Sequence, residues 1–552
     1  MKIHLLSNDQ TSQFAADELE AYLIRMGCPD LTYCLSVSDS VMSASPAACE
    51  TYADHTEDNP ASSIKEKPAE TLRQDQTDSY SIHVSADSGR ISGSNPRALL
   101  LGVYRYLTLI GCRFLRPGRE WEIVPVLTAP EQFYASETCA AGLRHRGVCL
   151  EGADSIENIL DFIDWSPKIG FNSFFLQFKY PHTFLKRWYS HENNPDLVPQ
   201  SWTMEDSMHV MPYLSKAMEK RGLLQHRVGH GWTGEVLGCK ATGWETETLP
   251  HNTHDSEDST SSSENSIADP KNSTADLEYS TAGSWGSTTD PQDSTAGSWG
   301  STTDSKDSNT DSMDSTAEIQ FSKNRFETEQ PSAAELRSLI AEVNGKRDLF
   351  QGIPTNTNLC LSNPTAVEHL ADRVALYLQE NPQTDYLHIW MADACNNFCE
   401  CENCRKLRPS DHYIALLNRI DERLCEQNIP TRIVLLLYMD LLWSPLKARL
   451  HHPERFVLMF APITRTFEES YADYAPQLHP DAGPLSQWTV GISAERNDGN
   501  AEHFSQRIER SAADAELRAL PHTPVPEFRL LHLSFPSDLE TYLAFLREWQ
   551  EK

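Results

Sequence analysis

The pattern of apolar and polar positions divides the chain into a short α/β segment and a longer series of alternating strands and helices. The first segment begins with a strand over residues 2–6 and a helix that ends at Gly27. A later strand is followed by a helix that begins at Asn95-Pro96, where the asparagine is a favourable N-cap and the proline fits the first helical position. These elements predict a small N-terminal α/β domain over residues 1–135.

Beyond residue 140, strand and helix patterns alternate as far as the chain continues. The expected strands are 144–151, 171–178, 223–229, 386–392, 432–438 and 456–461, with a further candidate at 528–533. The expected helices are one that opens at residue 154 and others at 211–221, 364–379 and 411–427. Strands this uniformly apolar predict a parallel sheet covered by helices, and so many consecutive βα units favour a (β/α)8 TIM-barrel-like domain. The strand count reaches only six or seven, so we expect a barrel over 140–552 that is incomplete at its C-terminal end.

Two polar stretches interrupt these domains. One spans about residues 50–78. The other, over 245–325, is rich in Ser, Thr and Asp, and its 251–320 window contains 14 acidic residues against two lysines. An 11-residue segment beginning at Ser280 recurs at Ser294, but two copies in a window nearly without Leu, Val or Phe do not make a solenoid. We therefore expect a disordered acidic insertion within the barrel.

Composition and charge exclude several classes of partner. The chain has 47 basic and 79 acidic residues and a formal net charge of -32, which repels phosphate backbones and anionic lipids. It lacks an apolar stretch that approaches the roughly 20 residues of a spanning helix, and its first residues turn polar too early for an export signal. We therefore expect a cytoplasmic protein without nucleic-acid or membrane partners. The pattern does not predict an oligomeric state.

Four cysteines follow the fourth expected strand of the barrel. Their spacing is Cys395-x3-Cys399-x-Cys401-x2-Cys404, within an Asn- and Glu-rich loop that could wrap around a metal ion. Four thiolates satisfy tetrahedral Zn²⁺ and leave no open position, so the expected role is a structural zinc and no cofactor is expected for catalysis. The alternative is a set of free thiols.

In a (β/α)8 barrel, reactive groups lie at the C-terminal ends of the strands and in the loops that follow them. The polar residues in such positions are Arg146, Glu151, His230, Glu235, Asp393, Tyr438, Asp440 and Arg465. None of the expected strands is followed by a G-x-S-x-G elbow, a Walker loop or a G-x-G-x-x-G turn. The sequence therefore does not support serine hydrolase or nucleotide chemistry.

Several motifs resemble known carbohydrate-active proteins. Ile91-Ser92-Gly93-Ser94-Asn95-Pro96-Arg97 and the helix after it resemble the N-terminal domain of α-glucuronidases and β-N-acetylhexosaminidases. Segments 228–233 (VGHGWT), 357–364 (TNLCLSNP) and 390–395 (WMADAC) resemble the bacterial domain of unknown function 4838, some relatives of which are endo-β-N-acetylglucosaminidases. The resemblance implies a glycosidase barrel after an N-terminal domain, with a carbohydrate as the partner.

The resemblance also suggests roles for particular residues. Arg146 would grip sugar hydroxyls, as in the first-strand segment of hexosaminidases, and Gly229-His230 matches their Gly-His pair. Asp393 matches the aspartate that orients the substrate acetamido group. Hexosaminidases place a glutamate directly after that aspartate as the general acid, whereas this chain has Ala394.

Glycoside hydrolysis normally requires two carboxyl groups, or one carboxyl group and the acetamido oxygen of the substrate. The candidates for the second carboxyl group are Glu235, Glu400, Glu402 and Asp440, with Glu235 preferred as proton donor. Each of them could instead be an ordinary surface carboxylate.

The remaining candidates also have a structural alternative. His230 could project into a cleft or be a core histidine bonded to a carbonyl group, and Trp232 could stack on a sugar or belong to the core. Arg146 could hold hydroxyls or a uronate, or pair internally with a group such as Glu151. Tyr438, Asp440 and Arg465 complete the expected substrate-binding set, although Arg465 could merely screen nearby glutamates.

These observations favour a glycoside hydrolase-like protein that acts on β-linked N-acetylhexosamine or uronic-acid glycans, with substrate-assisted hydrolysis as one route. Asp393, Glu235 and His230 would be the catalytic residues. The alternative is a non-catalytic glycan-binding or scaffold protein on a degenerate or truncated barrel, which the presence of Ala394 favours.

Overall fold

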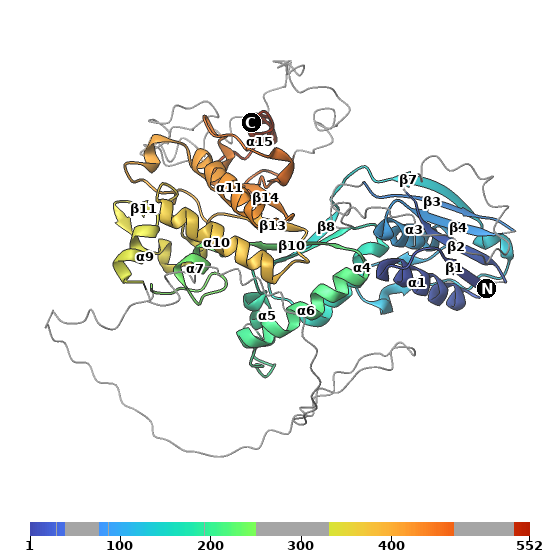
Figure 1. Cartoon of the computed structure of the whole chain (residues 1–552). Helices are drawn as coiled ribbons and strands as arrows, with labels where there is room; N and C mark the ends of the chain where they lie inside the picture. The colour runs from blue at the N-terminus through green and yellow to red at the C-terminus, as the bar shows by residue number, and fades with distance from the viewer. Residues whose placement is uncertain (29, 39–76, 87, 192–193, 250–330, 469–534) are drawn as a thin grey trace, which may run out of the picture. The chain divides into compact units, whose positions relative to one another are not determined.

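The computed structural model describes residues 1–28, 30–38, 77–86, 88–191, 194–249, 331–468 and 535–552 (Figure 1). The expected insertions at 50–78 and 245–325 fall almost entirely outside the described residues, and the candidate strand at 528–533 lies wholly outside them. Met1–Pro250 and Ser332–Lys552 form one compact unit, which contains two sheets of more than two strands.

The first sheet is mixed and has five strands in the order β1-β2-β4-β3-β7. Its strands are β1 (Lys2–Leu5), β2 (Thr32–Val37), β3 (Ser79–Val84), β4 (Gly89–Gly93) and β7 (Ala135–Ala140). The pairs β1–β2 and β2–β4 are parallel, whereas β3 is antiparallel to both β4 and β7. Because β7 belongs to this sheet, the N-terminal domain extends past the expected boundary at residue 135.

Two helices, α1 (Gln10–Met26) and α3 (Pro96–Leu109), pack against this sheet. The side chain of Asp9 accepts a hydrogen bond from the Ser12 backbone N–H, and Gly27 ends α1 in the left-handed conformation at φ 76°. Asn95 caps α3, with Pro96 at its first position, as the sequence predicts. The amphipathic pattern and these caps explain why both helices are evident in the sequence.

The second sheet has six strands, which are all parallel and lie in chain order. They are β8 (Gly147–Leu150), β9 (Ser173–Gln177), β10 (Leu224–Gly229), β13 (Tyr386–Ile389), β14 (Arg432–Leu437) and β15 (Phe456–Phe460). The sheet curls into half a barrel, and among the described residues β8 and β15 form its two edges (Figure 1). The structure confirms the TIM-barrel-like domain, and the described residues form its six-stranded half-barrel.

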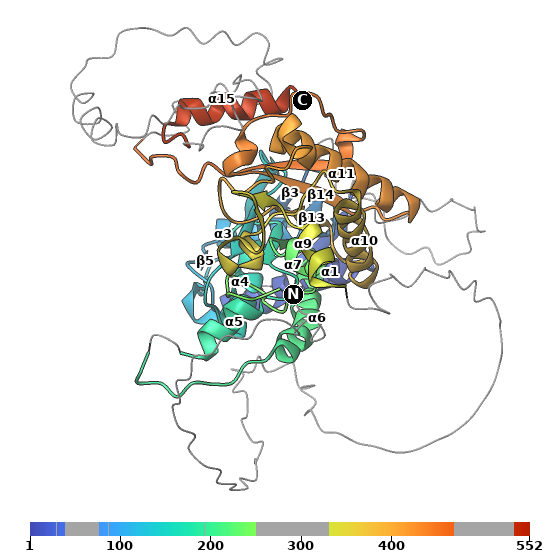
Figure 2. The same ribbon diagram turned by 90° about the vertical axis from the view of Figure 1, so that its left-hand side faces the viewer.

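Helices connect these strands and cover the outside of the half-barrel (Figure 1 and Figure 2). They are α4 (Ile156–Lys168), α5 (His182–Tyr189), α6 (Met204–Lys220), α7 (Trp232–Leu237), α9 (Ala333–Leu339), α10 (Pro364–Glu380), α11 (Pro409–Glu426) and α15 (Leu539–Gln550). Helices α10 and α11 pack side by side, with Leu370, Val374, Leu417 and Ile420 in the largest apolar core. Two short hairpins complete the described elements, β5 (Arg113–Phe114) with β6 (Glu122–Ile123) and β11 (Glu342–Val343) with β12 (Lys346–Arg347).

A buried ion cluster connects the N-terminal domain to the start of the half-barrel. Asp78 is 1% exposed and accepts hydrogen bonds from Arg97 Nη2 at 2.8 Å and Arg146 Nη2 at 2.7 Å. Asn172 Nδ2 donates a further bond of 2.9 Å to the same carboxylate. Although burial alone would raise the pKa of Asp78, the two guanidinium groups and Asn172 lower it to about 2.

Candidate active site

The C-terminal ends of five neighbouring strands carry polar side chains along one edge of the half-barrel. Glu151 directly follows β8, Gln177 ends β9, His230 directly follows β10, and Tyr438 directly follows β14. Asp393 lies in the loop after β13, which is the strand between β10 and β14. The C-terminal ends of parallel strands meet at one edge, so this is the edge where a barrel enzyme has its active site.

Asp393 is the centre of this group. Its Oδ1 accepts a hydrogen bond of 3.0 Å from the Tyr438 hydroxyl, and its Oδ2 accepts one of 2.8 Å from the indole N–H of Trp244. The Asp393 backbone N–H donates to the carbonyl oxygen of Thr355 at 2.9 Å. These bonds fix the orientation of the carboxylate, while 25% of its side chain stays exposed to solvent. A fixed carboxylate with partial access can receive a donor group from a ligand.

His230 lies beside Asp393 and is almost fully buried. Its Nδ1 is 2.6 Å from the carbonyl oxygen of Met391, which can only accept, so Nδ1 carries the proton. Its Nε2 is 3.7 Å from Asp393 Oδ1. Burial lowers the pKa of His230, and the charge of Asp393 opposes this only in part. The neutral ring therefore presents Nε2 as a hydrogen-bond acceptor next to Asp393.

Glu151 is the second carboxyl group of the site. Although part of it is exposed to solvent, its pKa is raised because partial desolvation and the negative charge of Asp393 both disfavour another carboxylate. Desolvation and the charge of Asp393 also raise the pKa of the Tyr438 phenol, to which Glu151 contributes a smaller effect. Two carboxyl groups in unequal environments therefore share this edge, which is the arrangement typical of acid and base partners.

The backbone next to His230 is strained. Val228 and Phe178, which are not glycines, have φ values of 75° and 69°, and the Phe178 N–H donates to the Val228 carbonyl oxygen at 2.5 Å. Gly229, at φ 83°, lies so close to its neighbours that a Cβ atom there would be 3.0 Å from the Trp390 ring and 3.2 Å from Gln177. This crowding directs His230 away from the sheet and toward Asp393.

Two buried polar atoms next to Gly229 lack a hydrogen-bond partner among the described residues. They are Gln177 Oε1 and Trp390 Nε1, in side chains from residues that are 1% and 6% exposed. One is an acceptor and the other a donor, and both belong to residues at the ends of strands β9 and β13. Unsatisfied buried groups are rare, so they indicate a place where a ligand or water supplies the missing bonds.

Two of the predicted site residues lie elsewhere. Trp232 is 4% exposed, and its indole N–H donates to the His388 carbonyl oxygen at 3.0 Å, so it is a core residue and cannot stack on a sugar. Glu235, the preferred proton donor, forms an ion pair of 3.4 Å with Lys179. Its charge also acts on Tyr377 of helix α10, which places it toward the outer helices. The tryptophan that contacts Asp393 is Trp244, whose indole N–H donates to the carboxylate.

The predicted arginines are engaged away from Asp393. Arg146 precedes β8, at the N-terminal edge of the sheet, and binds Asp78 as well as the carbonyl oxygens of Leu143 and Gly170. The guanidinium of Arg465 lies 4.6 Å from the ring of Phe467. Of the two alternatives for Arg146, the internal ion pair is the one observed, with Asp78 in place of Glu151.

The other predicted carboxylates contact loop backbone or lie on the surface. Asp440 is buried and accepts the backbone N–H of Asn396 at 2.9 Å. Glu400 accepts the backbone N–H of Asn344 at 2.7 Å, and Glu402 is 92% exposed and lies 3.9 Å from Lys406. These contacts explain the three residues as structural or surface carboxylates.

The cysteine cluster differs from the predicted one by one residue. The sulfur atoms of Cys399, Cys401 and Cys404 lie together with that of Cys360, and all four are within 4.8 Å of one another. Cys395 is not a member of this group. The left-handed turn at Asn396, with φ 55°, follows it, and the charge of Asp440 acts on its thiol. The prediction that Cys395 is the fourth ligand is therefore wrong.

Sequence reasoning missed Trp244 and did not select Glu151 as proton donor. Trp244 directly precedes the expected insertion and does not follow a predicted strand, so the barrel rule does not select it. Glu151 does have a signal, because it directly follows the first barrel strand. The sequence allows Glu151 as one possible partner of Arg146, and in the structure Arg146 binds Asp78 instead.

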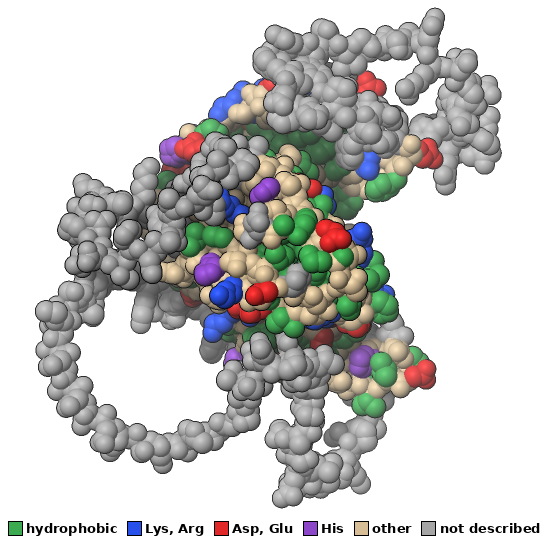
Figure 3. Space-filling view, turned by 90° about the vertical axis from the view of Figure 1, so that its right-hand side faces the viewer, with side chains coloured by type: hydrophobic (Ala, Val, Ile, Leu, Met, Phe, Trp, Pro, Cys, Tyr) green, Lys and Arg blue, Asp and Glu red, His purple; other side chains and the backbone are tan. Residues whose placement is uncertain are grey.

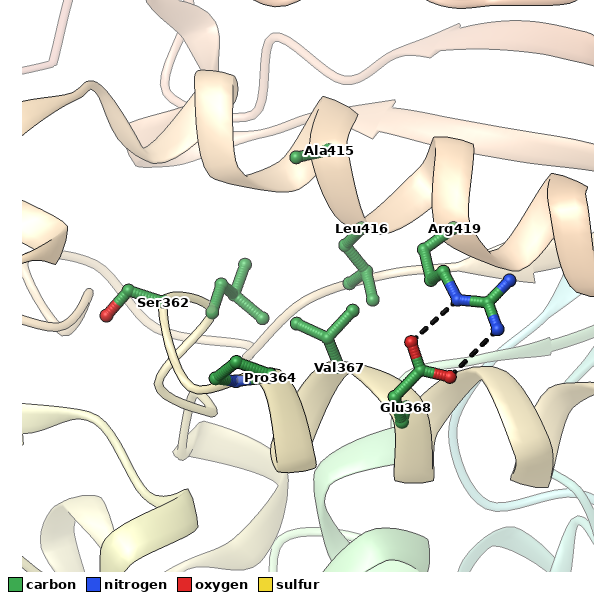
Figure 4. Close-up of a pocket in the computed structure, with 8 residues that line it drawn as sticks. Ser362, Pro364, Val367, Glu368, Ala415, Leu416 and Arg419 are labelled. Atoms are coloured by element: carbon green, nitrogen blue, oxygen red, sulfur yellow. Dashed lines mark hydrogen bonds and ion pairs between the residues drawn. The ribbon is translucent and has the colours of Figure 1, made fainter.

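The structure also contains a separate hollow of about 260 Å³ between helices α10 and α11 (Figure 4). Its walls include Leu361, Val367 and Leu416. The Glu368 carboxylate accepts two hydrogen bonds of 2.6 and 2.9 Å from the Arg419 guanidinium, and both residues line the hollow. It lies between outer helices and away from the strand ends. We therefore do not assign it to the active site.

The described surface carries side chains of both charges (Figure 3). On the face shown in Figure 3, acidic and basic side chains are scattered among polar and apolar ones. Within the described ranges, every helix is too short or too polar to cross a membrane.

A half-barrel of parallel strands with two carboxyl groups at its C-terminal edge is a glycosidase-like arrangement. Residues 252–488 match the model of the family described as "Domain of unknown function (DUF4838)". This match confirms the resemblance predicted from segments 357–364 and 390–395. A search of curated proteins finds no match.

Several solved structures of glycoside hydrolases are similar at low identity. A β-N-acetylhexosaminidase from Bacteroides fragilis is 9% identical with a TM-score of 0.37, over 83% of this chain and 66% of that one. An N-acetyl-β-hexosaminidase from Streptomyces plicatus is 10% identical with a TM-score of 0.37, over 86% and 66%. A family 89 glycoside hydrolase from Clostridium perfringens is 10% identical with a TM-score of 0.35, over 78% and 37%.

The chain thus covers between 37% and 66% of the lengths of these three enzymes. With TM-scores below 0.5, these likenesses do not establish a shared activity or substrate.

Proposed function

We propose that this protein hydrolyses glycosidic bonds of β-linked N-acetylhexosamine, with Glu151 as general acid and Asp393 as the carboxylate that orients the substrate. The observation that supports this most directly is the pair of unequal carboxyl groups at the C-terminal edge of the half-barrel. Asp393 is held by Trp244 and Tyr438, and its negative charge helps to raise the pKa of Glu151. A raised pKa keeps Glu151 protonated at higher pH, as a general acid requires.

The mechanism that fits these groups is substrate-assisted. The amide N–H of an N-acetyl group would donate to Asp393, which positions the acetamido oxygen for attack on the anomeric carbon. Glu151 would transfer its proton to the departing glycosidic oxygen, and later accept a proton from the water that opens the cyclic intermediate. His230 Nε2 would accept a hydrogen bond from a sugar hydroxyl. Trp244, which is partly exposed beside Asp393, would contact the sugar ring.

The structure favours an acetamido sugar over a uronate for this site. A uronate carboxylate needs a nearby cation, and the two arginines predicted for that role are engaged elsewhere, Arg146 with Asp78 and Arg465 with Phe467. An acetamido group is neutral and needs an acceptor for its N–H, which Asp393 provides.

The second candidate function is glycan binding without catalysis. The observation that favours it is Ala394, which stands where the related hexosaminidases have a glutamate. In that case the aromatic and polar groups around Asp393 would bind a sugar, and Glu151 would contribute a hydrogen bond only.

The test compares hydrolysis of nitrophenyl β-N-acetylglucosaminide and chitobiose by the unmodified protein and by Glu151→Gln, Asp393→Asn and Glu235→Gln variants. We expect Glu151→Gln to lower kcat on chitobiose by about 10²–10⁴-fold. The loss on the nitrophenyl substrate should be smaller, because nitrophenolate leaves without protonation. Asp393→Asn should impair both substrates, and Glu235→Gln should change neither.

The pH profile provides a second measure. As pH rises through the raised pKa of Glu151, the proton is lost and kcat/KM should fall, and this alkaline limb should be absent in Glu151→Gln. Equal turnover by the unmodified protein and Glu151→Gln would contradict the assignment. Sugar binding in calorimetry without turnover of either substrate would support the second candidate.

A further inference from the structure

Four cysteine side chains from two separate segments converge outside the candidate active site. Cys360 precedes helix α10, whereas Cys399, Cys401 and Cys404 lie in the loop between β13 and α11. The Cys360 sulfur is 3.5 Å from that of Cys399, 3.8 Å from that of Cys401 and 3.9 Å from that of Cys404. None of the four forms a disulfide, and each of these separations far exceeds an S–S bond of about 2 Å.

These separations correspond to the edges of a tetrahedron around a metal ion. Sulfur atoms bound to Zn²⁺ at about 2.3 Å in tetrahedral geometry are about 3.8 Å apart. Without an ion, a cluster of four thiols would gain little from such close approach, because thiols are weak donors and weak acceptors. The arrangement is explained if the sulfurs share a cation.

The surroundings resemble an outer ligand shell. The backbone N–H of Glu342 donates to the Cys399 sulfur at 3.3 Å, and that of Cys404 donates to the Cys401 sulfur at 3.5 Å. The guanidinium of Arg347 lies near the sulfurs of Cys360 and Cys401. Donors and a cation of this kind stabilise thiolates, and they offset the double negative charge of a zinc ion with four thiolate ligands.

We propose that Cys360, Cys399, Cys401 and Cys404 bind one structural zinc ion. Four thiolates suit Zn²⁺, and they leave it no open position for a substrate or a reactive water. Three of the four cysteines are buried, so the ion would be shielded from solvent. This inference does not depend on the proposed glycosidase activity.

The zinc would clamp the loop that carries Asp393 to the segment in front of helix α10. Asp393 is six residues before Cys399, and the same two segments also meet through Asn358 Nδ2, which donates to Asn397 Oδ1 at 3.0 Å. Asn397 Nδ2 in turn donates to the Asn356 carbonyl oxygen at 2.7 Å. Metal–sulfur bonds would thus join two segments that are otherwise connected by hydrogen bonds between buried amide groups.

The first experiment measures metal in the full chain, purified under reducing conditions without chelator. We expect elemental analysis to find one zinc per chain. Cys360→Ser should lose most of the zinc and lower the melting temperature, whereas Cys395→Ser should keep both unchanged. Cys395 is the matched control because it lies in the same loop, four residues before Cys399, and outside the sulfur cluster.

The second experiment keeps the proposal testable if Cys360→Ser does not fold. Zinc in the unmodified chain is replaced by cobalt, and we expect the intense visible bands of a tetrahedral thiolate complex. A chain that contains no zinc, and takes up none when reduced and supplied with zinc, would overturn the proposal. So would iron as the native metal, or loss of zinc in Cys395→Ser but not in Cys360→Ser.

Discussion

Glu151 and Asp393 illustrate how neighbouring residues of the same chemistry acquire different tasks. Two donors, from Trp244 and Tyr438, hold Asp393, whereas partial desolvation and the charge of Asp393 raise the pKa of Glu151. Neither property is evident from residue type. The difference between the two carboxyl groups arises from what each one contacts.

A second residue-scale feature is a cluster of three histidines, in which His145 and His226 pack against Tyr386 and His388 contacts His226. His226 Nδ1 is 2.8 Å from His388 Nε2, and His145 meets the Tyr386 ring edge-on at 4.7 Å. Burial lowers the pKa of His226 to about 3 and, together with nearby arginines, that of His145 to about 4. All three rings are therefore neutral at pH 7.

This histidine cluster predicts acid sensitivity. The unfolded chain binds protons at these positions near pH 6.5, while the folded chain binds them only at lower pH, so stability falls as pH drops below 6.5. Each histidine contributes a loss of up to about 1.4 kcal/mol per pH unit. His145→Phe should make the loss between pH 6.5 and 4.5 smaller, because neither ring nitrogen has a hydrogen-bond partner in the structure.

The measurement is urea unfolding at several pH values, with His83→Gln as the control at an exposed position. An unchanged pH dependence in His145→Phe would contradict this role.

At the scale of elements, the end of β10 shows how a strand positions a side chain. Gly229 is at φ 83° and is enclosed by Trp390 and Gln177, whereas Gly238, at φ 70°, has no atom within 4 Å of a Cβ position. Gly229→Ala should therefore destabilise the fold by about 1–3 kcal/mol more than Gly238→Ala. Both variants place alanine in the left-handed conformation, but only the methyl group at position 229 would press against neighbouring side chains. Thermal unfolding of the two variants would measure the difference. Equal effects would show that the side chains around position 229 move to accommodate the methyl group.

The elements themselves were largely predictable from the sequence. Strands β10, β13 and β14 and helices α10 and α11 lie within a few residues of their predicted ranges, because apolar runs and capping residues mark them. The site residues directly after strands, His230 and Tyr438, followed from the barrel rule.

The contacts that redefine the site could not be predicted. Trp244 and Asp393 are 149 positions apart, and Cys360 is 39 positions before Cys399, so only folding brings each pair together. Asp78 was assigned to a polar insertion because its sequence neighbours are hydrophilic, although it is one of the most buried carboxylates. Local composition does not report burial of this kind.

At the scale of the whole molecule, the Asp78 cluster connects the two sheets. A carboxylate that is 1% exposed between Arg97 and Arg146 loses both ion pairs if its charge is removed, and two largely buried guanidinium groups then lack a counter-charge. Asp78→Asn should therefore lower the free energy of unfolding by about 3–5 kcal/mol. Glu137→Gln, which breaks the more exposed pair with Arg105, should cost less than about 1 kcal/mol.

Denaturant unfolding at neutral pH compares the two variants, and the folded pKa of about 2 makes a further test possible. The stability that Asp78 contributes should be complete above pH 4 and disappear as pH falls toward 2, since protonation then favours the unfolded chain. Similar losses in Asp78→Asn and Glu137→Gln would show that the buried cluster does not hold the two sheets together.

The position of the matched family segment within the half-barrel has a consequence for modularity. Residues 252–488 begin after β10, so they include β13, β14 and β15 but omit the three strands that carry Glu151, Gln177 and His230. A fragment cut at these limits would expose the flank of β13 that pairs with β10 and would lack Glu151, Gln177 and His230. We therefore expect residues 252–488 not to fold as an autonomous unit, and a recombinant fragment should keep the three preceding strands.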